Sequence, residues 1–221
     1  MWIKVDLHVH TSNSKDGVSR LDEILKAAMK RGLHGIAITD HDVPLSFRDA
    51  EELSGQTGLL IIPGVEITTK QGHLLALCFE ENFKTSIDVY EAADLIKSSG
   101  GLLIVPHPLD KFSQGIGERL TLEIAPHAIE VYNASSWRRF NRRAFTLVQK
   151  SGIPGVAGSD AHHWRAVGAA YTVIDVKGLT IEDALKSIRE GRVRAIEGYI
   201  PLSVSLLTVA CKAVKKLKCL L

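Results

Sequence analysis

Cysteine is scarce in this chain of 221 residues. The three cysteines, Cys78, Cys211 and Cys219, are odd in number and include no Cys-x-x-Cys pair, which argues against a disulfide framework and against a thiolate metal site. A reducing cytoplasm fits this usage. No apolar run approaches the ~20 residues that a bilayer span needs. The opening MWIKVDLHVHT carries charged residues and histidines, so we expect neither a signal peptide nor a membrane segment.

A strong charge of one sign is also missing. Lys+Arg 27 against Asp+Glu 25 leaves a net charge of +2, which is too balanced for a chain whose main role is to coat nucleic acid. The 45% hydrophobic and 24% charged residues are typical of a soluble globular protein and exclude a disordered or fibrous class. No repeat, proline-rich linker or low-complexity stretch divides the chain, so its length predicts one sizeable core.

Short apolar runs alternate with amphipathic segments along the chain. The runs expected to be strands are 3–9, 35–38, 59–67, 73–79, 101–105, 128–132, 155–157, 169–174 and 193–196. The segments expected to be helices are 19–31, 47–56, 86–98, 137–150 and 180–189. Continuous apolar strands between helices predict a parallel sheet covered by helices, and the number of strands favours an α/β barrel.

We expect the barrel to span residues 1–197 as a single domain. Residues 198–221 begin with an apolar run and end in a cluster of lysines. This segment is expected to be a C-terminal helix or basic tail that packs on the barrel. A contact with a membrane surface or with nucleic acid is the less favoured interpretation, because one short basic cluster is weak support for either.

Histidines and carboxylates gather where the predicted strands end. Six of the nine histidines lie at or beside an apolar run: His8, His10, His41, His73, His107 and His162. Carboxylates occupy the same places: Asp40, Asp42, Glu66 and Asp160. Because the carboxyl ends of parallel barrel strands meet at one mouth, these side chains should converge there. Imidazoles and carboxylates without thiolates suit Zn²⁺, Mn²⁺ or Fe²⁺.

Each of these residues has a structural interpretation when it is taken alone. His8 and His10 face the same side of a strand and can hold one ion, or can be inward histidines bonded to backbone carbonyls. Taken singly, His73 is interpreted as a core residue and His107 as a turn residue. Glu66 differs, because a buried charge needs a partner and the adjacent strands offer no basic residue. His34 and His127 precede strands and are expected at the opposite end of the barrel.

Five short motifs carry a resemblance to a known family. DLHVHT at 6–11, TDHD at 39–42, GVEIT at 64–68, PHP at 106–108 and GSDAH at 158–162 occur in the order typical of the PHP (polymerase and histidinol phosphatase) family. The resemblance implies a distorted (βα)7 TIM-like barrel that binds two or three divalent ions and hydrolyses phosphoesters.

The resemblance also implies which residues bind each ion. One ion would take His8, His10, Glu66 and Asp160. A second would share Glu66 and add His73 and His107, and a third would take Asp16, His41 and His162. Asp16 stands where some family members have a histidine.

The implied chemistry is in-line attack on phosphorus by a metal-bridging hydroxide. Glu66, Asp160, His162 and Asp42 are the expected catalytic residues, with His163 and Asp40 as further proton donors or orienting groups. The expected substrate-binding residues are Arg165, His163, Asn133 and Ser135. Arg165 offers a guanidinium fork for phosphate, or is a solvated loop residue. Lys111 is a weaker phosphate ligand, and Trp137 and Trp164 either stack on a base or pack at the rim.

The function favoured by the sequence is metal-dependent hydrolysis of a small, nucleotide-like phosphate monoester. Two enzymatic alternatives remain, a histidinol-phosphate phosphatase and a nuclease. The balanced charge and the lack of an extended basic stripe count against the nuclease. A non-catalytic PHP module of structural role is the alternative from another class, and nine metal-capable residues at one mouth count against it.

Overall fold

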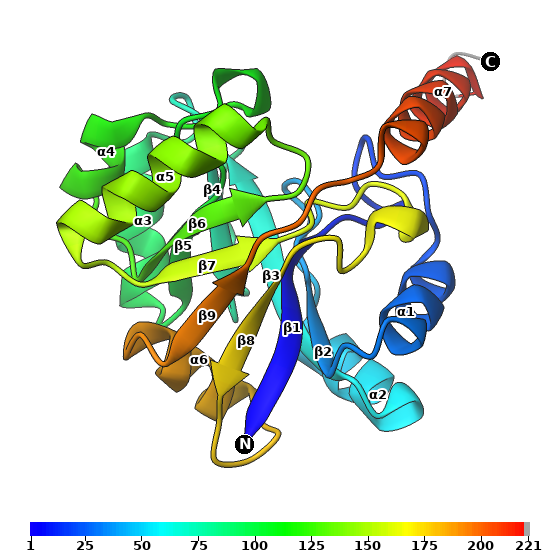
Figure 1. Cartoon of the computed structure of the whole chain (residues 1–221), viewed down its shortest axis with the longest axis horizontal. Helices are drawn as coiled ribbons and strands as arrows, with labels where there is room; N and C mark the ends of the chain where they lie inside the picture. The colour runs from blue at the N-terminus through cyan, green and yellow to red at the C-terminus, as the bar shows by residue number, and fades with distance from the viewer. Residues whose placement is uncertain (219–221) are drawn as a thin grey trace.

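The computed structural model describes residues 1–218, in which nine strands form one sheet of order β7-β6-β5-β4-β3-β2-β1-β8-β9 (Figure 1). The strands are β1 (Trp2–Val9), β2 (Gly35–Ile38), β3 (Leu60–Thr68), β4 (His73–Leu77), β5 (Leu102–Val105), β6 (Ala128–Asn133), β7 (Gly155–Gly158), β8 (Tyr171–Asp175) and β9 (Val193–Ile196). The helices are α1 (Leu21–Lys30), α2 (Phe47–Thr57), α3 (Val89–Ser98), α4 (Glu118–Glu123), α5 (Arg138–Ser151), α6 (Ile181–Arg189) and α7 (Leu202–Lys218). Two 3₁₀ turns, η1 (Lys111–Ser113) and η2 (Trp164–Ala166), lie in loops.

The sheet is mixed, so the expectation of a wholly parallel sheet was wrong. Strands β1, β2, β3, β5, β6, β7 and β9 run in one direction, whereas β4 and β8 run against their neighbours. β4 is reversed because the four-residue turn Thr69–Gly72 is too short for a crossover and can only make a hairpin. β8 is the second reversed strand. It lies beside β1 in antiparallel register, with Ile3 opposite Ile174.

Side-chain hydrogen bonds bring the two ends of the sheet together into a nearly closed barrel. The Thr172 hydroxyl on β8 accepts from the backbone N–H of Ala157 on β7 and donates to its carbonyl, both at 2.8 Å. Beyond β7 the chain pairs with the end of β1, where the N–H of His10 donates to the carbonyl of Ala161 at 2.9 Å. The expected α/β barrel in a single domain is therefore confirmed.

Apolar side chains fill the barrel and fix its helices. Ile3, Val5 and Leu7 of β1 belong to a fully buried cluster that draws on every strand from β1 to β8 and on α6. α1 and α2 pack on the outer face of β1–β3, and α3 packs on β3–β5. Within the described residues no helix is long and apolar enough to cross a membrane. These apolar side chains thus form the base of the barrel and support the polar residues at its mouth.

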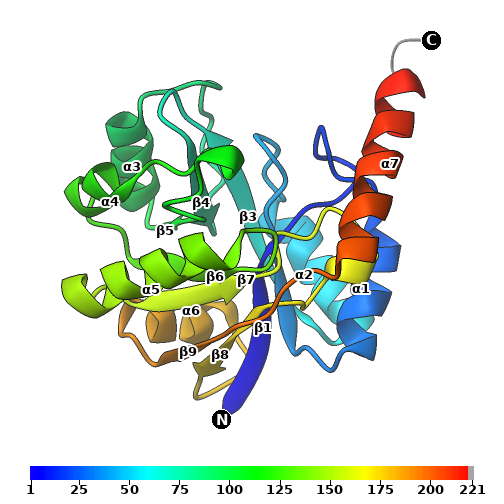
Figure 2. The ribbon, with the colours of Figure 1, turned by 45° about the horizontal axis from the view of Figure 1, so that its top comes forward.

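The C-terminal segment forms the helix α7, which stands beside the loop that follows β1 (Figure 2). The Lys215 ammonium group donates to three carbonyls of that loop, those of Ser12, Ser14 and Gly17, at 2.7–2.9 Å. One face of α7 remains apolar and exposed. The expected tail extends to residue 221, and its last three residues, 219–221, lie outside the described part.

Candidate metal centre

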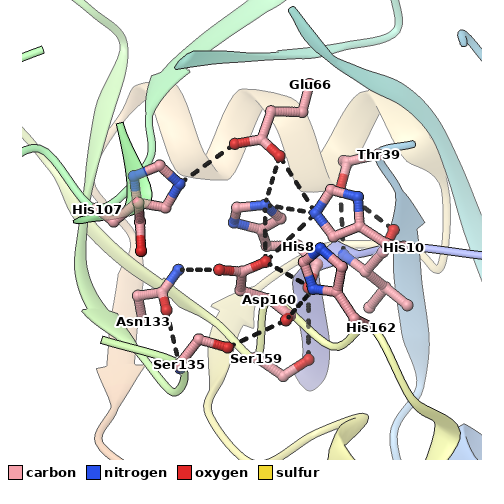
Figure 3. Close-up of polar contacts among 12 residues, drawn as sticks. His8, His10, Thr39, Glu66, His107, Asn133, Ser135, Ser159, Asp160 and His162 are labelled. Atoms are coloured by element: carbon pink, nitrogen blue, oxygen red, sulfur yellow. Dashed lines mark hydrogen bonds and ion pairs between the residues drawn. The ribbon is translucent and has the colours of Figure 1, made fainter. Parts of the chain in front are cut away.

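Glu66 lies at the centre of a buried group of imidazoles (Figure 3). Its Oε2 atom is 3.2–3.3 Å from nitrogens of His8, His10 and His41. Its Oε1 atom is 3.0 Å from His73 Nδ1 and 3.2 Å from His107 Nε2. The two oxygens of one carboxylate therefore face two separate sets of imidazoles.

Asp160 and Asp16 extend this group toward the surface. Asp160 Oδ1 is 3.3 Å from His10 Nε2 and 3.4 Å from His162 Nδ1. Asp16 lies on the other side of His162, with its Oδ2 atom 2.8 Å from His162 Nε2. His41 Nε2 is 3.8 Å from Asp16 Oδ1. All nine residues that the sequence nominated as metal ligands therefore lie in one continuous group.

The nine residues fall into four overlapping sets whose ligand atoms lie within 4.8 Å of one another. The sets are His8, His10 and Asp160; His8, Glu66 and His107; His41, Glu66 and His73; and His10, Asp16, His41 and His162. The last set contains the expected third-ion ligands together with His10. How ligands divide among individual ions stays a prediction.

The imidazole nitrogens that face the carboxylates are crowded together as a metal centre would require. Among the described residues, the buried nitrogens His10 Nδ1, His73 Nε2 and His107 Nδ1 have no hydrogen-bond partner. His8 Nε2 and His10 Nε2 face each other at 3.1 Å. The three unpaired nitrogens lie on the sides of their rings away from Glu66, so the nitrogens beside the carboxylate are the ones that could bind an ion. Nitrogen and oxygen donors without thiolates fit Zn²⁺, Mn²⁺ or Fe²⁺.

A local irregularity in β1 directs the first two histidines into the mouth. The pairing register of β1 with β2 shifts between Asp6 and Val9. Leu7 packs inside the barrel whereas Val9 packs outside against α1, although strict alternation would place both on one face. Such bulges re-aim side chains beside functional sites. Here the shift lets His8 and His10 both point toward Glu66.

Backbone geometry at two further ligand positions is unusual. His107 and Asp160 have φ of 31° and 52°, a left-handed region that non-glycine residues seldom adopt. The two residues lie on different loops, and both belong to the metal-capable group. The surrounding fold therefore holds their backbones in this strained conformation. Gly158 permits the approach of β7, because a Cβ atom there would lie 2.5 Å from the Cβ of His8.

A buried acid that the sequence did not single out orients several of these groups. Glu130 on β6 lies 3.1 Å from His8 Nδ1 and accepts a hydrogen bond from the backbone N–H of His107 at 2.9 Å. The Asn133 amide donates to Glu130 and to Asp160. The sequence does contain a sign of this residue, because Glu130 is a carboxylate within the apolar run AIEVY. The same pattern identified Glu66. Hydrogen-bonded carboxylates of this kind fix the tautomer and orientation of ligating imidazoles.

Burial and close carboxylates shift the ionisation of the cluster strongly. Burial lowers the pKa of His10, but hydrogen bonds to Asp160 and Glu66 outweigh it and raise that pKa to about 9. Burial lowers the pKa of His41 to about 3. Burial raises the pKa of Glu66, yet the charge of His8 and the bonds to neighbouring imidazoles hold it well below its ordinary value. The carboxylate thus stays ionised inside the protein.

A cavity of about 370 Å³ opens above Glu66. Its walls include seven of the nine metal-capable residues, all but His8 and His10, and around them Lys15, Phe112, Gln114, Ser135, Thr208 and Lys212. Lys15, Gln114, Thr208 and Lys212 were not among the residues predicted for the site. Thr208 and Lys212 come from α7, and the Lys212 ammonium lies 2.9 Å from Asp16. Concave, largely preformed spaces of this size are typical of small-molecule sites.

The residues nominated for substrate binding are placed differently from one another. Ser135 lines the cavity and donates to the carbonyl of Asp160, whereas Asn133 is buried beneath it. In the described chain, Arg165 and His163 do not line the cavity. Arg165 is turned outward by η2 and stacks over the Trp164 ring at 5.1 Å, and its backbone N–H donates to His163 Nδ1.

Two acids from the TDHD motif serve the loops around the cluster. Asp42 lies outside the cavity lining of the described residues, and its carboxylate accepts from the Thr68 N–H at 2.8 Å. Asp40 accepts from both the backbone N–H and the hydroxyl of Thr11 at 2.6 Å. The first contact holds the end of β3, which carries Glu66, and the second holds the loop that follows His10.

Two family models match the chain. The model described as PHP domain matches residues 6–103, and the model described as PHP-associated matches residues 138–193. An uncharacterized protein of Methanocaldococcus jannaschii is 32% identical over 142 residues, which are 60% of this chain and 82% of that protein. The phosphoribosyl 1,2-cyclic phosphate 1,2-diphosphodiesterase of Eggerthella lenta is 33% identical over 82 residues, 34% of this chain and 31% of that protein.

A solved structure shares the fold. It is a two-domain protein of Bacteroides vulgatus containing a predicted PHP-like metal-dependent phosphoesterase, with a TM-score of 0.71 and 21% sequence identity. The match covers 90% of this chain and 65% of the other. At this level of identity the likeness concerns the barrel alone.

Proposed function

The chain belongs to the PHP family, and from this premise we propose that it is a metal-dependent phosphoesterase of small, nucleotide-like phosphate monoesters. The observation that carries the proposal is the cluster of nine metal-capable side chains at the floor of the cavity. A phosphate ester resists hydrolysis because its anionic oxygens repel the attacking oxygen. A site for such esters must therefore concentrate positive charge, and this donor set is suited to holding it.

Bound divalent ions would neutralise the phosphoryl oxygens and lower the pKa of water at the site. Glu66 is the residue suited to bridge two of them, because each of its oxygens faces its own group of imidazoles. His8, His10 and Asp160 would complete one side, and His73 and His107 the other. Glu130 would hold His8 in the orientation that turns its Nε2 atom toward the ions.

The remaining catalytic candidates divide by position. Asp160 and His162 lie in the cavity wall, where they would hold an ion or transfer a proton next to the substrate. Asp42 would act as a positioning residue, because its carboxylate holds the backbone of Thr68 rather than facing the cavity. Asp40 would keep the Thr11 loop in place in the same manner.

We assign the substrate phosphate contact to Lys212 in place of Arg165. Lys212 faces the cavity beside Asp16, whereas the Arg165 guanidinium lies over Trp164. Lys15 offers a second cation, and the exposed Ser135 hydroxyl offers a hydrogen bond at the opposite wall. A phosphate group bound between the ions and Lys212 would be contacted from both sides.

The alternative functions differ in what they require of this cavity. A non-catalytic module has no use for five imidazoles gathered around one buried carboxylate, so the cluster counts against it. No feature of the cavity favours histidinol phosphate over other monoesters. A nuclease needs cations and stacking surfaces beyond the cavity itself.

A substrate panel tests the proposed activity. The purified chain, loaded separately with Mn²⁺, Zn²⁺ or Fe²⁺, is assayed for phosphate release from p-nitrophenyl phosphate, nucleoside monophosphates and histidinol phosphate. We expect metal-dependent release with preference for a nucleotide, abolished by EDTA and restored by adding the metal. Absence of turnover on every ester with all three metals would contradict the proposal.

A further inference from the structure

An exposed group of aromatic and arginine side chains borders the cavity, outside the metal centre. It consists of Phe112 on η1 and of Trp137, Arg139, Phe140 and Arg142 at the start of α5, and we call it the arginine–aromatic surface. Phe112 is 77% exposed and Trp137 is 59% exposed. Large aromatic side chains are seldom left in water in this way unless they meet a partner.

The rings of this surface form one contiguous aromatic group. The Phe112 and Trp137 centroids are 5.7 Å apart, and those of Trp137 and Phe140 are 6.4 Å apart with planes inclined by 29°. The Arg139 guanidinium lies 4.5 Å from the Trp137 centroid and 4.7 Å from that of Phe140. The surface therefore presents flat apolar faces and a cation side by side.

The positive charge here has no internal counterpart. α5 begins with Arg138 and Arg139, carries Arg142 and Arg143 one turn later, and contains no acidic residue. In the part of the chain that the structure describes, none of these arginines forms an ion pair with a carboxylate. Arginines at a helix N-terminus oppose the helix dipole. Their placement is unfavourable for α5 itself and favours an anionic ligand.

The surface continues into the cavity of the metal centre. Phe112 belongs both to the aromatic group and to the cavity wall. Ser135 also lines the cavity and precedes Trp137 by two residues. A ligand that follows the aromatic rings toward Phe112 therefore arrives directly above the metal-capable residues.

We propose that the arginine–aromatic surface binds single-stranded nucleic acid and leads one of its phosphates into the cavity. The proposal rests on the proposed phosphoesterase function and widens its substrate class from small monoesters to single-stranded nucleic acid. Unpaired bases stack on exposed aromatic rings while arginines neutralise the backbone, the combination that sequence-tolerant single-strand binders use. An acidic peptide would use the arginines but leave the rings without a partner. A duplex keeps its bases stacked on each other and offers no free base face to Phe112 or Trp137.

Binding is measured without catalysis. Fluorescence anisotropy of a 3′-labelled 12-mer of deoxythymidine is recorded in EDTA over a range of salt concentrations. Phe112→Ala should weaken binding about fivefold or more, since a stacked base contributes at that level, and should leave the salt dependence unchanged. R139Q/R142Q should weaken binding and also flatten the slope of log Kd against log salt, because fewer counterions are displaced.

The matched control is R48Q/K30Q, which removes two positive charges from α2 and α1 on another side of the barrel. This variant should bind the oligonucleotide as the unmodified chain does. Equal affinity of R139Q/R142Q and the control, or a duplex that binds as tightly as the single strand, overturns the proposal. Because the assay contains EDTA, its result is separate from that of the phosphate-release panel. An active phosphoesterase that does not bind the 12-mer refutes only this inference, and R139-dependent binding without turnover refutes only the proposed activity.

Discussion

Glu66 is a buried carboxylate whose negative charge must be compensated. Its side chain is 1% exposed and meets five imidazoles, and no lysine or arginine of residues 1–218 is among its partners. Burying a carboxylate is costly unless positive charge compensates it. Protonated histidines supply that charge when no ion is bound, and divalent ions would supply it otherwise. The cluster would therefore release protons when an ion binds.

Proton release should accompany metal binding at neutral pH. The carboxylates raise the pKa of His10 to about 9, so its imidazolium must lose a proton before an ion can bind. His41, whose pKa burial lowers to about 3, is already neutral and releases none. Metal affinity should consequently increase with pH up to about 9 and then level off.

Isothermal titration of Mn²⁺ in buffers of different ionisation enthalpy counts these protons. We expect release of one or more protons at pH 7 and distinctly fewer at pH 9.5. Equal heats in all buffers at pH 7 would show that the imidazoles are neutral beforehand and would contradict the ionisation described for His10.

At the scale of elements, α7 changes what the mouth can bind. The sequence predicts a basic helix here, and its lysines are in fact divided in role. Lys215 fastens the helix to the loop after β1, and Lys212 faces the cavity, whereas Lys216 is exposed. A helix outside the recognised motifs thus supplies part of the cavity wall.

Lys212→Ala tests that role against Lys216→Ala on the same helix. Loss of a charge-assisted contact with substrate phosphate should raise KM roughly tenfold, with a smaller change in kcat, while Lys216→Ala should leave both near their original values. Steady-state kinetics on the best ester of the panel measures the split. Equal KM for the two variants would place Lys212 outside substrate binding.

Periodicity predicts most elements but not their directions or irregularities. The alternation of β1 predicts a strand, yet it gives no sign of the register shift beyond Asp6 that turns both histidines inward. β4 reads as one more apolar strand, and only pairing reveals that His73 enters the mouth from the start of a reversed strand. The short helix α4 has too few residues for a periodic signal.

The candidate site was predictable where the signal was chemical and less so where it depended on loop geometry. Imidazoles and acids at strand ends converge as barrel topology requires. Arg165 was nominated because it follows His162 closely in sequence, and the η2 turn directs it away from the cavity. Lys212 lies far along the chain from every motif, so only the packing of α7 reveals it.

On the scale of the whole molecule, apolar and polar halves have separate tasks. The interior cluster and α6 stabilise the base of the barrel, and the mouth carries the buried charges. The net charge of +2 conceals this division, because it averages the buried carboxylates of the mouth with the arginines of α5. Overall charge therefore understated what the surface beside the mouth can bind.

Metal content per chain tests the central claim most directly. The chain, Glu66→Gln and the matched control His127→Ala are loaded with Mn²⁺, freed of excess ion and measured by elemental analysis alongside phosphate release. His127 lies outside the described cavity lining, where it accepts from the Leu103 N–H. We expect about two or three ions in the original chain and the control, and loss of both metal and turnover in Glu66→Gln. A metal-free original chain, or Glu66→Gln with full metal and unchanged turnover, would contradict the account.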